Sequence, residues 1–346
     1  MNIINIKQQG RCGEERQFQN KVSNNFLQII NQKLSSLHFL NILDIKELVL
    51  FQCKNFKLQT VPENIQKLFI SDCQLKRINI NHLQELNELE LSQNKIKNLK
   101  GIQMLKYLRL LNLEDNKIST IEQIKQLQCI EQLNMNGNLI NDIQPICTLT
   151  RLRKLYLSQN KIKSINLMQR LYNLQELELR NNQINNINAI GHLTQLQVLN
   201  IAENNITEIY ALQQLYQLRV LQINDNKVVH VQALQHLIGL THFEAENNCI
   251  IDQKILENHP NYKYYCIRLQ TVPTKEQIKM SIIYKCISDQ YYSILAIKKK
   301  QKQLQIKQTQ YKLKCQQSMQ TAANNELQFV RKTISIIQQL DLDNYQ

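Results

Sequence analysis

The chain has 346 residues, of which 43% are hydrophobic, so it is long enough to bury a sizeable core. Only 6 Gly and 4 Pro occur, which argues against long irregular loops. The sequence has no run of 18 apolar residues and no N-terminal apolar segment of signal-peptide length, so we expect neither a membrane span nor secretion. We predict a cytoplasmic protein and leave nuclear or cytoskeletal association open.

The formal net charge of +14 is unevenly distributed along the chain. Residues 262–346 contain 14 Lys and Arg against 5 Asp and Glu, a net +9, and the first 261 residues carry the remaining +5. The nine cysteines are scattered, and none forms a CxxC pair. We therefore expect reduced thiols.

Residues 1–40 precede the first recognisable repeat. They contain an apolar cluster of Phe26, Leu27, Ile29 and Ile30. Because a stack of repeats must cover its terminal hydrophobic face, we predict that this segment is an N-terminal cap and that the cap is helical.

Two short repeat units follow, and each carries Cys where the later units carry Asn. The steps are 20 residues from Cys53 to Cys73 and 21 residues from Cys73 to Asn94. A small buried thiol with weak hydrogen-bonding ability fits such a position, and a redox or metal role is the alternative. With the eight units that follow, these two predict about ten coils.

From Leu86 onward a 22-residue frame, LxxLxLxxNxIxxI, recurs in seven consecutive steps without insertion. Such strict self-similarity is the signature of a repeat architecture. The frame can be followed along a ladder of asparagines, which are Asn94, Asn116, Asn138, Asn160, Asn182, Asn204, Asn226 and Asn248.

Each part of the frame predicts a piece of local structure. The LxL motif has period two, which is typical of a short strand with both leucines on one face. The Asn side chain has donors and an acceptor, so it can satisfy turn backbone groups that would otherwise be buried without partners. The later apolar positions are three residues apart, which favours a tight 3₁₀-like or extended return. One coil cannot bury its own leucine face, so the coils must stack into a parallel sheet.

These motifs resemble the 22-residue subclass of leucine-rich repeats, which includes a regulatory subunit of protein phosphatase 1 and the bacterial internalins. The resemblance covers roughly residues 41–260. It implies an α/β solenoid, a curved array with a parallel sheet on its concave side and short 3₁₀ or extended returns on its convex side.

The residues between the strand leucines point away from the core, onto the concave face. Summed over the ten units, this face has twelve acidic residues and three basic ones. An acidic face argues against nucleic acid in the groove and favours a basic protein partner, although a solvated polar face is the alternative. We predict that the protein-binding residues are Phe51, Phe69, Glu88, Glu90, Asn112, Glu114, Asn134, Tyr156, Glu176, Glu178, Arg180, Asn200, Gln222, Glu244 and Glu246.

The C-terminal part of the sequence predicts a cap over the last coil and an extension that follows it. Residues 261–272 resemble the aromatic segment that closes this subclass, with Tyr262, Tyr264 and Tyr265 over the last coil. Residues 273–346 contain helical stripes, and we predict a basic, Gln-rich helical extension in which a coiled coil is one alternative. It carries the basic run Lys298, Lys299, Lys300 and Lys302.

No GxGxxG, GxxxxGK[ST] or HExxH motif occurs, so we expect no enzyme activity, no cofactor and no metal. We predict an interaction module or adaptor that binds a basic protein partner, and the resemblance implies a phosphatase-regulatory or cytoskeletal role. The alternative is a scaffold whose basic tail binds RNA or an anionic membrane surface, or folds back to occlude the groove.

Overall fold

A computed structural model describes residues 21–23, 25–34, 36–261 and 265–267, and the structural statements below concern these residues. The predicted helical extension over 273–346, including its basic run, lies outside them, as do Tyr262 and Tyr264. Within the described ranges, no helix has the length and apolar character needed to cross a membrane.

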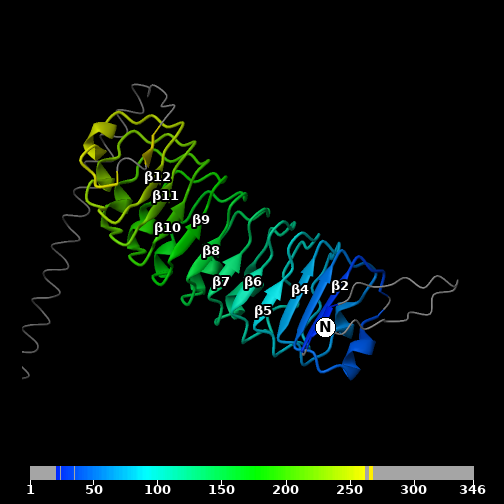
Figure 1. Ribbon diagram of the computed structural model, residues 1–346. Helices are drawn as coiled ribbons and strands as arrows, with labels where there is room; N and C mark the ends of the chain where they lie inside the picture. The colour runs from blue at the N-terminus through cyan, green and yellow to red at the C-terminus, as the bar shows by residue number, and fades with distance from the viewer. Residues whose placement is uncertain (1–20, 24, 35, 262–264, 268–346) are drawn as a thin grey trace, which may run out of the picture. The chain divides into compact units, whose positions relative to one another are not determined.

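Thirteen strands form one sheet in which the strand order follows the chain order (Figure 1). The first pair is antiparallel and all later pairs are parallel. The strands are β1 (Lys21–Ser23), β2 (Phe26–Ile30), β3 (Glu47–Phe51), β4 (Lys67–Ser71), β5 (Glu88–Glu90), β6 (Leu110–Asn112), β7 (Gln132–Asn134), β8 (Lys154–Tyr156), β9 (Glu176–Glu178), β10 (Val198–Asn200), β11 (Val220–Gln222), β12 (His242–Glu244) and β13 (Tyr265–Cys266).

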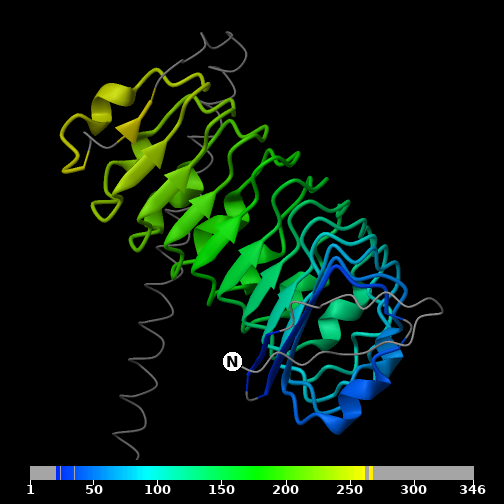
Figure 2. The same cartoon turned by 45° about the vertical axis from the view of Figure 1, so that its right-hand side comes forward.

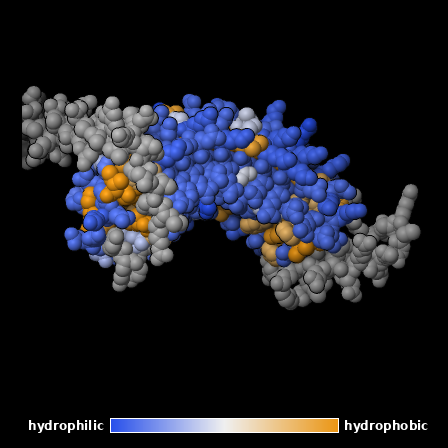
Figure 3. Space-filling view, turned by 90° about the horizontal axis from the view of Figure 1, so that it is seen from above, coloured by the Kyte–Doolittle hydropathy of each residue, from blue (hydrophilic) through white to orange (hydrophobic). Residues whose placement is uncertain are grey.

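Nine of the returns between strands contain a short 3₁₀ segment, whereas the returns from β4 to β5 and from β5 to β6 consist of turns without one. The 3₁₀ segments lie on the side opposite the strands (Figures 1 and 2). Seen from above, the described solenoid is an arch that is hollowed on one side (Figure 3). The 3₁₀ segments are η1 (His38–Ile42), η2 (Leu58–Thr60), η3 (Glu122–Gln126), η4 (Ile146–Thr148), η5 (Met168–Arg170), η6 (Asn188–His192), η7 (Tyr210–Gln214), η8 (Gln232–Leu234) and η9 (Gln253–Leu256).

The register between strands repeats the sequence period. Leu89 of β5 lies beside Leu111 of β6, which lies beside Leu133 of β7, and all three side chains are fully buried. Each step of 22 residues therefore places one leucine on top of its equivalent. The predicted parallel leucine-rich solenoid is confirmed. Strands β3–β12 correspond to the ten predicted coils, and β2 and β13 extend the sheet at its two ends.

The predicted helical cap is wrong for the apolar cluster, which forms strand β2. Leu27 and Ile29 are 0% and 1% exposed, whereas Ile30 is 37% exposed. This alternation has the period of a strand with one buried face. β2 pairs with β3 in the same parallel register as the repeats, and β1 folds back on it. The N-terminal end is thus one more coil of the sheet, and the 3₁₀ segment η1 is its return.

The eight ladder asparagines are 0–8% exposed, and each joins its own coil to the preceding one. In Asn160 the side-chain oxygen accepts the Ile140 amide proton at 3.0 Å, and Nδ2 donates to the Met135 oxygen at 2.9 Å and to the Leu157 oxygen at 3.1 Å. One side chain therefore satisfies backbone groups of two coils that water cannot reach.

The two cysteines of the early units occupy the same ladder. The amide of Cys53 donates to the Cys73 sulfur at 3.2 Å, and the amide of Cys73 donates to Asn94 Oδ1 at 3.1 Å. Cys53 also donates from its sulfur to the Ile29 oxygen at 3.4 Å. A thiol thus provides one weak acceptor and one weak donor where Asn provides stronger ones.

The residue before each ladder position turns the chain out of the strand in the left-handed region. Its φ is 54° at Gln93, 52° at Asp115 and 56° at Gln159, and in one coil the residue is Gly137, with a φ of 64°. Asn and Asp tolerate this conformation better than most residues do. These turn residues, which were counted on the predicted concave face, lie beyond the strand ends.

Replacing a ladder asparagine should destabilise the solenoid strongly. Asn160→Ala leaves the Ile140 amide and the Met135 oxygen buried without their partner, and we expect a loss of about 3 kcal/mol in the free energy of unfolding. Asn160→Cys should cost less, because a thiol already occupies this position twice. Urea unfolding measures both, and the exposed Asn141→Ala provides a control that should change little. Equal stability of all three variants would contradict the role of the ladder.

Gly101 should tolerate no side chain. Its φ is 107°, and an added Cβ would collide with the backbone oxygen of Ile78. We expect Gly101→Ala to lower the free energy of unfolding by about 2 kcal/mol or more. Gly137→Ala is the matched comparison, because its added Cβ would meet the movable side chain of Asp115 and its φ is one that other residues adopt in neighbouring coils. A smaller loss for Gly101→Ala than for Gly137→Ala would refute this explanation.

Candidate functional site

The candidate site is the outward side of the sheet, hereafter the strand face. In each three-residue strand the middle residue is buried and the first and third are half-buried or exposed. The structure therefore brings the first residues of β5–β12 into one row and the third residues into a second row. The third-position row is Glu90, Asn112, Asn134, Tyr156, Glu178, Asn200, Gln222 and Glu244.

All three basic residues of this face are neutralised by an acidic residue of the next coil. Lys67 lies 2.7 Å from Glu88, Lys154 lies 2.7 Å from Glu176, and Arg180 lies 2.5 Å from Glu203. No Lys or Arg of the described ranges forms an ion pair with the other nine of the twelve predicted acidic residues. These nine are Glu47, Asp72, Glu90, Glu114, Asp115, Glu178, Asp225, Glu244 and Glu246. Three of them, Asp72, Asp115 and Asp225, lie in the turns at the edge of the face.

The middle of the strand face concentrates negative charge around one tyrosine. Burial, together with the neighbouring charges of Glu176 and Glu114, raises the pKa of Glu178 above its ordinary value, and a hydrogen bond from Asn136 partly offsets this. The hydroxyl of Tyr156 donates to Glu176 at 2.6 Å. Burial and this hydrogen bond raise the pKa of Tyr156, so its proton is retained at neutral pH. The centre therefore presents a hydrogen-bonded phenol among carboxylates.

Several predicted contact residues also organise the backbone. The side-chain oxygens of Asn112, Asn134 and Asn200 each accept the amide proton of the residue two positions later, at 3.0–3.1 Å. Nδ2 of Asn112 donates to Glu90 at 2.5 Å, and Nδ2 of Asn134 donates to Glu114 at 3.0 Å. Asn112 and Asn134 therefore hold the carboxylates of Glu90 and Glu114 in place.

Two further asparagines belong to this network, and they were expected on the concave face but not among the predicted protein-binding residues. Asn136 accepts the Ser158 amide proton at 2.6 Å, and Asn224 donates to Glu244 at 3.0 Å. The signal available in the sequence was their shared position, two residues before the ladder asparagine. Gln222 also donates to Glu244, at 3.1 Å.

The N-terminal end of the strand face is apolar. Ile30 pairs with Phe51, and Val49 pairs with Phe69, in the longer strands β2–β4. Ile30 and Phe51 are 37% and 36% exposed. Figure 3 shows hydrophobic residues near the two ends of the described solenoid and a hydrophilic stretch between them. Ile30 was not among the predicted binding residues, because the apolar cluster that contains it was expected to form a helical cap.

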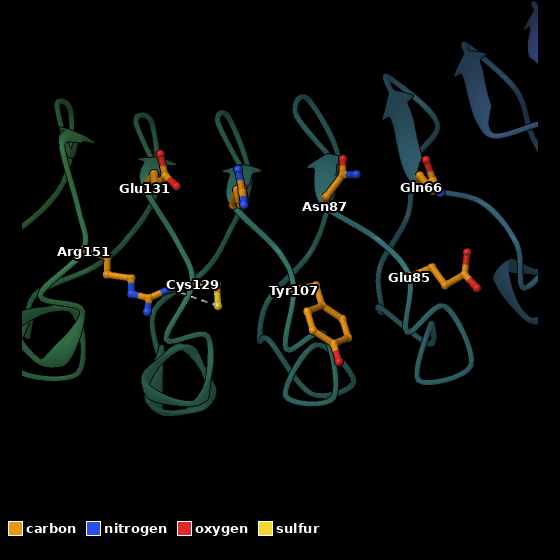
Figure 4. Close-up of a pocket in the computed structure, with 8 residues that line it drawn as sticks. Gln66, Glu85, Asn87, Tyr107, Cys129, Glu131 and Arg151 are labelled. Atoms are coloured by element: carbon orange, nitrogen blue, oxygen red, sulfur yellow. Dashed lines mark hydrogen bonds between the residues drawn. The ribbon is translucent and has the colours of Figure 1, made fainter.

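A separate hollow of about 440 Å³ lies along the edge where the strands begin (Figure 4). Arg151 donates to the Cys129 sulfur there at 3.7 Å, and none of the predicted contact residues lines the hollow. Its lining residues are Gln66, Glu85, Asn87, Tyr107, Arg109, Cys129, Glu131 and Arg151. In the part of the chain that the structure describes, no cluster of three His, Cys, Asp or Glu side chains could hold a metal ion.

Two carboxylates of the strand face should have opposite effects on stability. The pKa of Glu178 is raised in the folded state, so ionisation of Glu178 destabilises the fold, and the cost grows as pH rises through that pKa. Burial alone would raise the pKa of Glu176, but the hydrogen bonds from Lys154 and Tyr156 lower it below its ordinary value. The ionised form of Glu176 therefore stabilises the fold.

We therefore expect Glu178→Gln to raise the free energy of unfolding at pH 7 by up to about 1 kcal/mol and Glu176→Gln to lower it by a similar amount. Urea unfolding at pH 7 and pH 4 checks the sign, and both differences should shrink at the lower pH. Destabilisation by Glu178→Gln that is independent of pH would contradict the electrostatic explanation.

Comparisons with known proteins agree with this geometry. Residues 150–192 match a family model described as two copies of leucine rich repeats. The solved internalin InlF of Listeria monocytogenes is 24% identical, covers 71% of this chain and 87% of its own, and has a TM-score of 0.58. A leucine-rich repeat protein of Leptospira interrogans is 22% identical over 68% of this chain and 75% of its own, with a TM-score of 0.51.

The plant peptide hormone receptor RGFR1, solved in complex with RGF2, has a TM-score of 0.58 at 17% identity, over 70% of this chain and 42% of its own. No curated protein matches the sequence. The repeat frame, the coil-by-coil register and these likenesses lead to the same assignment. The chain is therefore built from leucine-rich repeats and has the leucine-rich repeat fold.

Proposed function

We propose that the chain is a non-catalytic interaction module that binds a basic segment of a protein partner on its strand face. One observation carries this proposal. The three cations of the face are each paired with an acidic residue of the next coil, and nine carboxylates remain without such a partner among the described residues. This occurs in a chain whose formal net charge is +14.

The arrangement of the face supports specific binding as well as attraction. Hydrogen bonds fix Glu90 through Asn112, Glu114 through Asn134, and Glu244 through Asn224, so these carboxylates lose little freedom when a cation binds. Charge complementarity accelerates encounter and excludes acidic competitors. Half-buried Tyr156 provides the kind of anchor that contributes most to binding energy.

The cellular role of the chain depends on which partner it binds. A phosphatase-regulatory or cytoskeletal adaptor role is the one that the repeat subclass offers, and it requires a partner with a Lys/Arg-rich surface. Localisation to the cytoplasm is part of the same proposal.

A second candidate is competition from within the chain. Residues 262–346 are basic, with a net charge of +9, and the strand face has nine carboxylates that form no ion pair with a described Lys or Arg. We infer that the run Lys298, Lys299, Lys300 and Lys302 competes with the partner for this face. Replacing the four lysines by Gln in the full chain should then raise affinity for a basic peptide. Unchanged affinity would exclude the competition, and it would leave the partner proposal intact.

Charge reversal on the strand face should abolish partner capture. Glu114→Lys, Glu178→Lys and Glu244→Lys together place three cations among the acidic rows, and we expect affinity for a Lys/Arg-rich peptide to fall by about a hundredfold at low salt. The matched control is Glu63→Lys, Glu85→Lys and Glu257→Lys, three exposed residues away from the face that change the net charge equally. Crosslinking pulldown from native cells with mass spectrometry identifies the partner, and equal recovery with both triple variants would refute the proposal.

A further inference from the structure

A second charged surface follows the ladder, on the flank where each coil leaves the sheet. The residue after each ladder position forms one row along the solenoid axis. Lys33 bridges Lys54 in parallel register, and the amides of Lys117 and Lys161 donate to the Ile96 and Ile140 oxygens of the preceding coils at 2.8 Å. Neighbouring positions of this row are therefore one coil apart, about 4.8 Å.

Lysines accumulate on this flank over the first coils. The four-residue segments 33–36, 54–57, 74–77, 95–98, 117–120, 139–142 and 161–164 contain ten basic residues and one acidic residue, Asp142. All ten are exposed, and none forms an ion pair with a described residue. We call them the lysine flank, and they are Lys33, Lys54, Lys57, Lys76, Arg77, Lys95, Lys97, Lys117, Lys161 and Lys163.

The coil itself does not require these charges. At the same row position later coils carry Gln183 and Asn205, which keep the same backbone hydrogen bond to the preceding coil. Like charges one coil apart repel one another, so the lysine flank weakens the solenoid unless an external anion binds there. The strand face cannot supply that anion within its own molecule, because its carboxylates project from the sheet and make no ion pair with this flank.

The chemistry of the flank indicates which anion fits. Nine of its ten cations are Lys, which acts as a point charge without the planar fork that Arg uses for phosphate recognition. Its only aromatic residue, Phe56, is partly buried against the core, so no aromatic side chain is available to stack on bases. Leu139, which is 43% exposed, occupies the row between Lys117 and Lys161. An apolar side chain within a lysine row suits a lipid headgroup layer better than a nucleic acid backbone.

We propose that the lysine flank docks on a membrane surface rich in anionic lipid, with Leu139 entering the headgroup region. Clusters of four to eight basic residues suffice for such attraction, and mobile headgroups adjust to any lysine spacing. The strand face stays available for its partner in this arrangement. The proposal stands independently of the function proposed for that face.

The test uses the full chain and vesicles of phosphatidylcholine and phosphatidylserine in a three-to-one ratio, compared with phosphatidylcholine alone. The flank variant combines Lys95→Gln, Lys97→Gln, Lys117→Gln, Lys161→Gln and Lys163→Gln. The control removes five exposed cations from the opposite flank through Lys106→Gln, Arg109→Gln, Arg151→Gln, Arg153→Gln and Arg219→Gln. Both variants change the net charge equally and keep residues 262–346 unchanged, so any contribution of those residues cancels.

We expect the wild type and the control to sediment with the anionic vesicles and the flank variant to bind about tenfold or more weakly, with the difference lost at high salt. Leu139→Ser should weaken vesicle binding severalfold without changing any binding to nucleic acid. Circular dichroism of each variant verifies folding.

Three results would overturn the proposal. The first is a wild type that does not bind anionic vesicles, and the second is equal weakening by the flank and control variants. The third is a flank variant that keeps vesicle binding but loses binding to duplex RNA or DNA, which would assign the lysines to a nucleic acid.

Discussion

The structure depends on buried backbone groups beside each turn, which only an amide side chain can satisfy fully. Each coil leaves the sheet through a tight turn whose outer residues are exposed, and the amide and carbonyl groups that the ladder asparagine binds lie beyond the reach of water. Asn160 and its equivalents bind the backbone of their own coil and of the coil before it. This constraint explains why one residue type recurs at every step of 22 while the residues around it vary.

The ladder also determines where recognition can occur. Because it fixes the coil spacing, the outward residues of consecutive strands line up in rows, and the residues after the ladder line up in another row on the flank. Charges that are 22 residues apart in sequence thus become neighbours in space. The charges of Lys154 and Glu176 cancel, whereas the carboxylates of Glu114 and Glu178 both contribute negative charge to the same surface. Segregation of charge between two surfaces is a direct consequence of the period.

Most of the fold could be predicted from the sequence, because the 22-residue period specifies both where each strand lies and which strands it pairs with. The parallel sheet, the 3₁₀ returns and the outward positions of Glu90 and Tyr156 all follow from it. The prediction of a helical cap was wrong because Leu27 and Ile29 lie in a short apolar run outside the repeat frame, and such a run fits a helix and a strand equally well. The repeat pattern could not predict the hydrogen bonds from Asn112 and Asn134 to carboxylates, because these bonds depend on side-chain geometry. The lysine flank was visible in the recurring NKIK motif, but only the stacking shows that its lysines form one surface.

The central claim is that the strand face is where a basic partner binds, and site-specific photocrosslinking tests it most directly. A photoreactive amino acid at position 134, 156 or 200 on the strand face is compared in native cells with one at position 185 or 207, in the coils of β9 and β10 but away from the face. The account predicts crosslinks to a Lys/Arg-rich segment of one protein from the three face positions only. Crosslinks that arise equally from both sets, or only from the control positions, would contradict it.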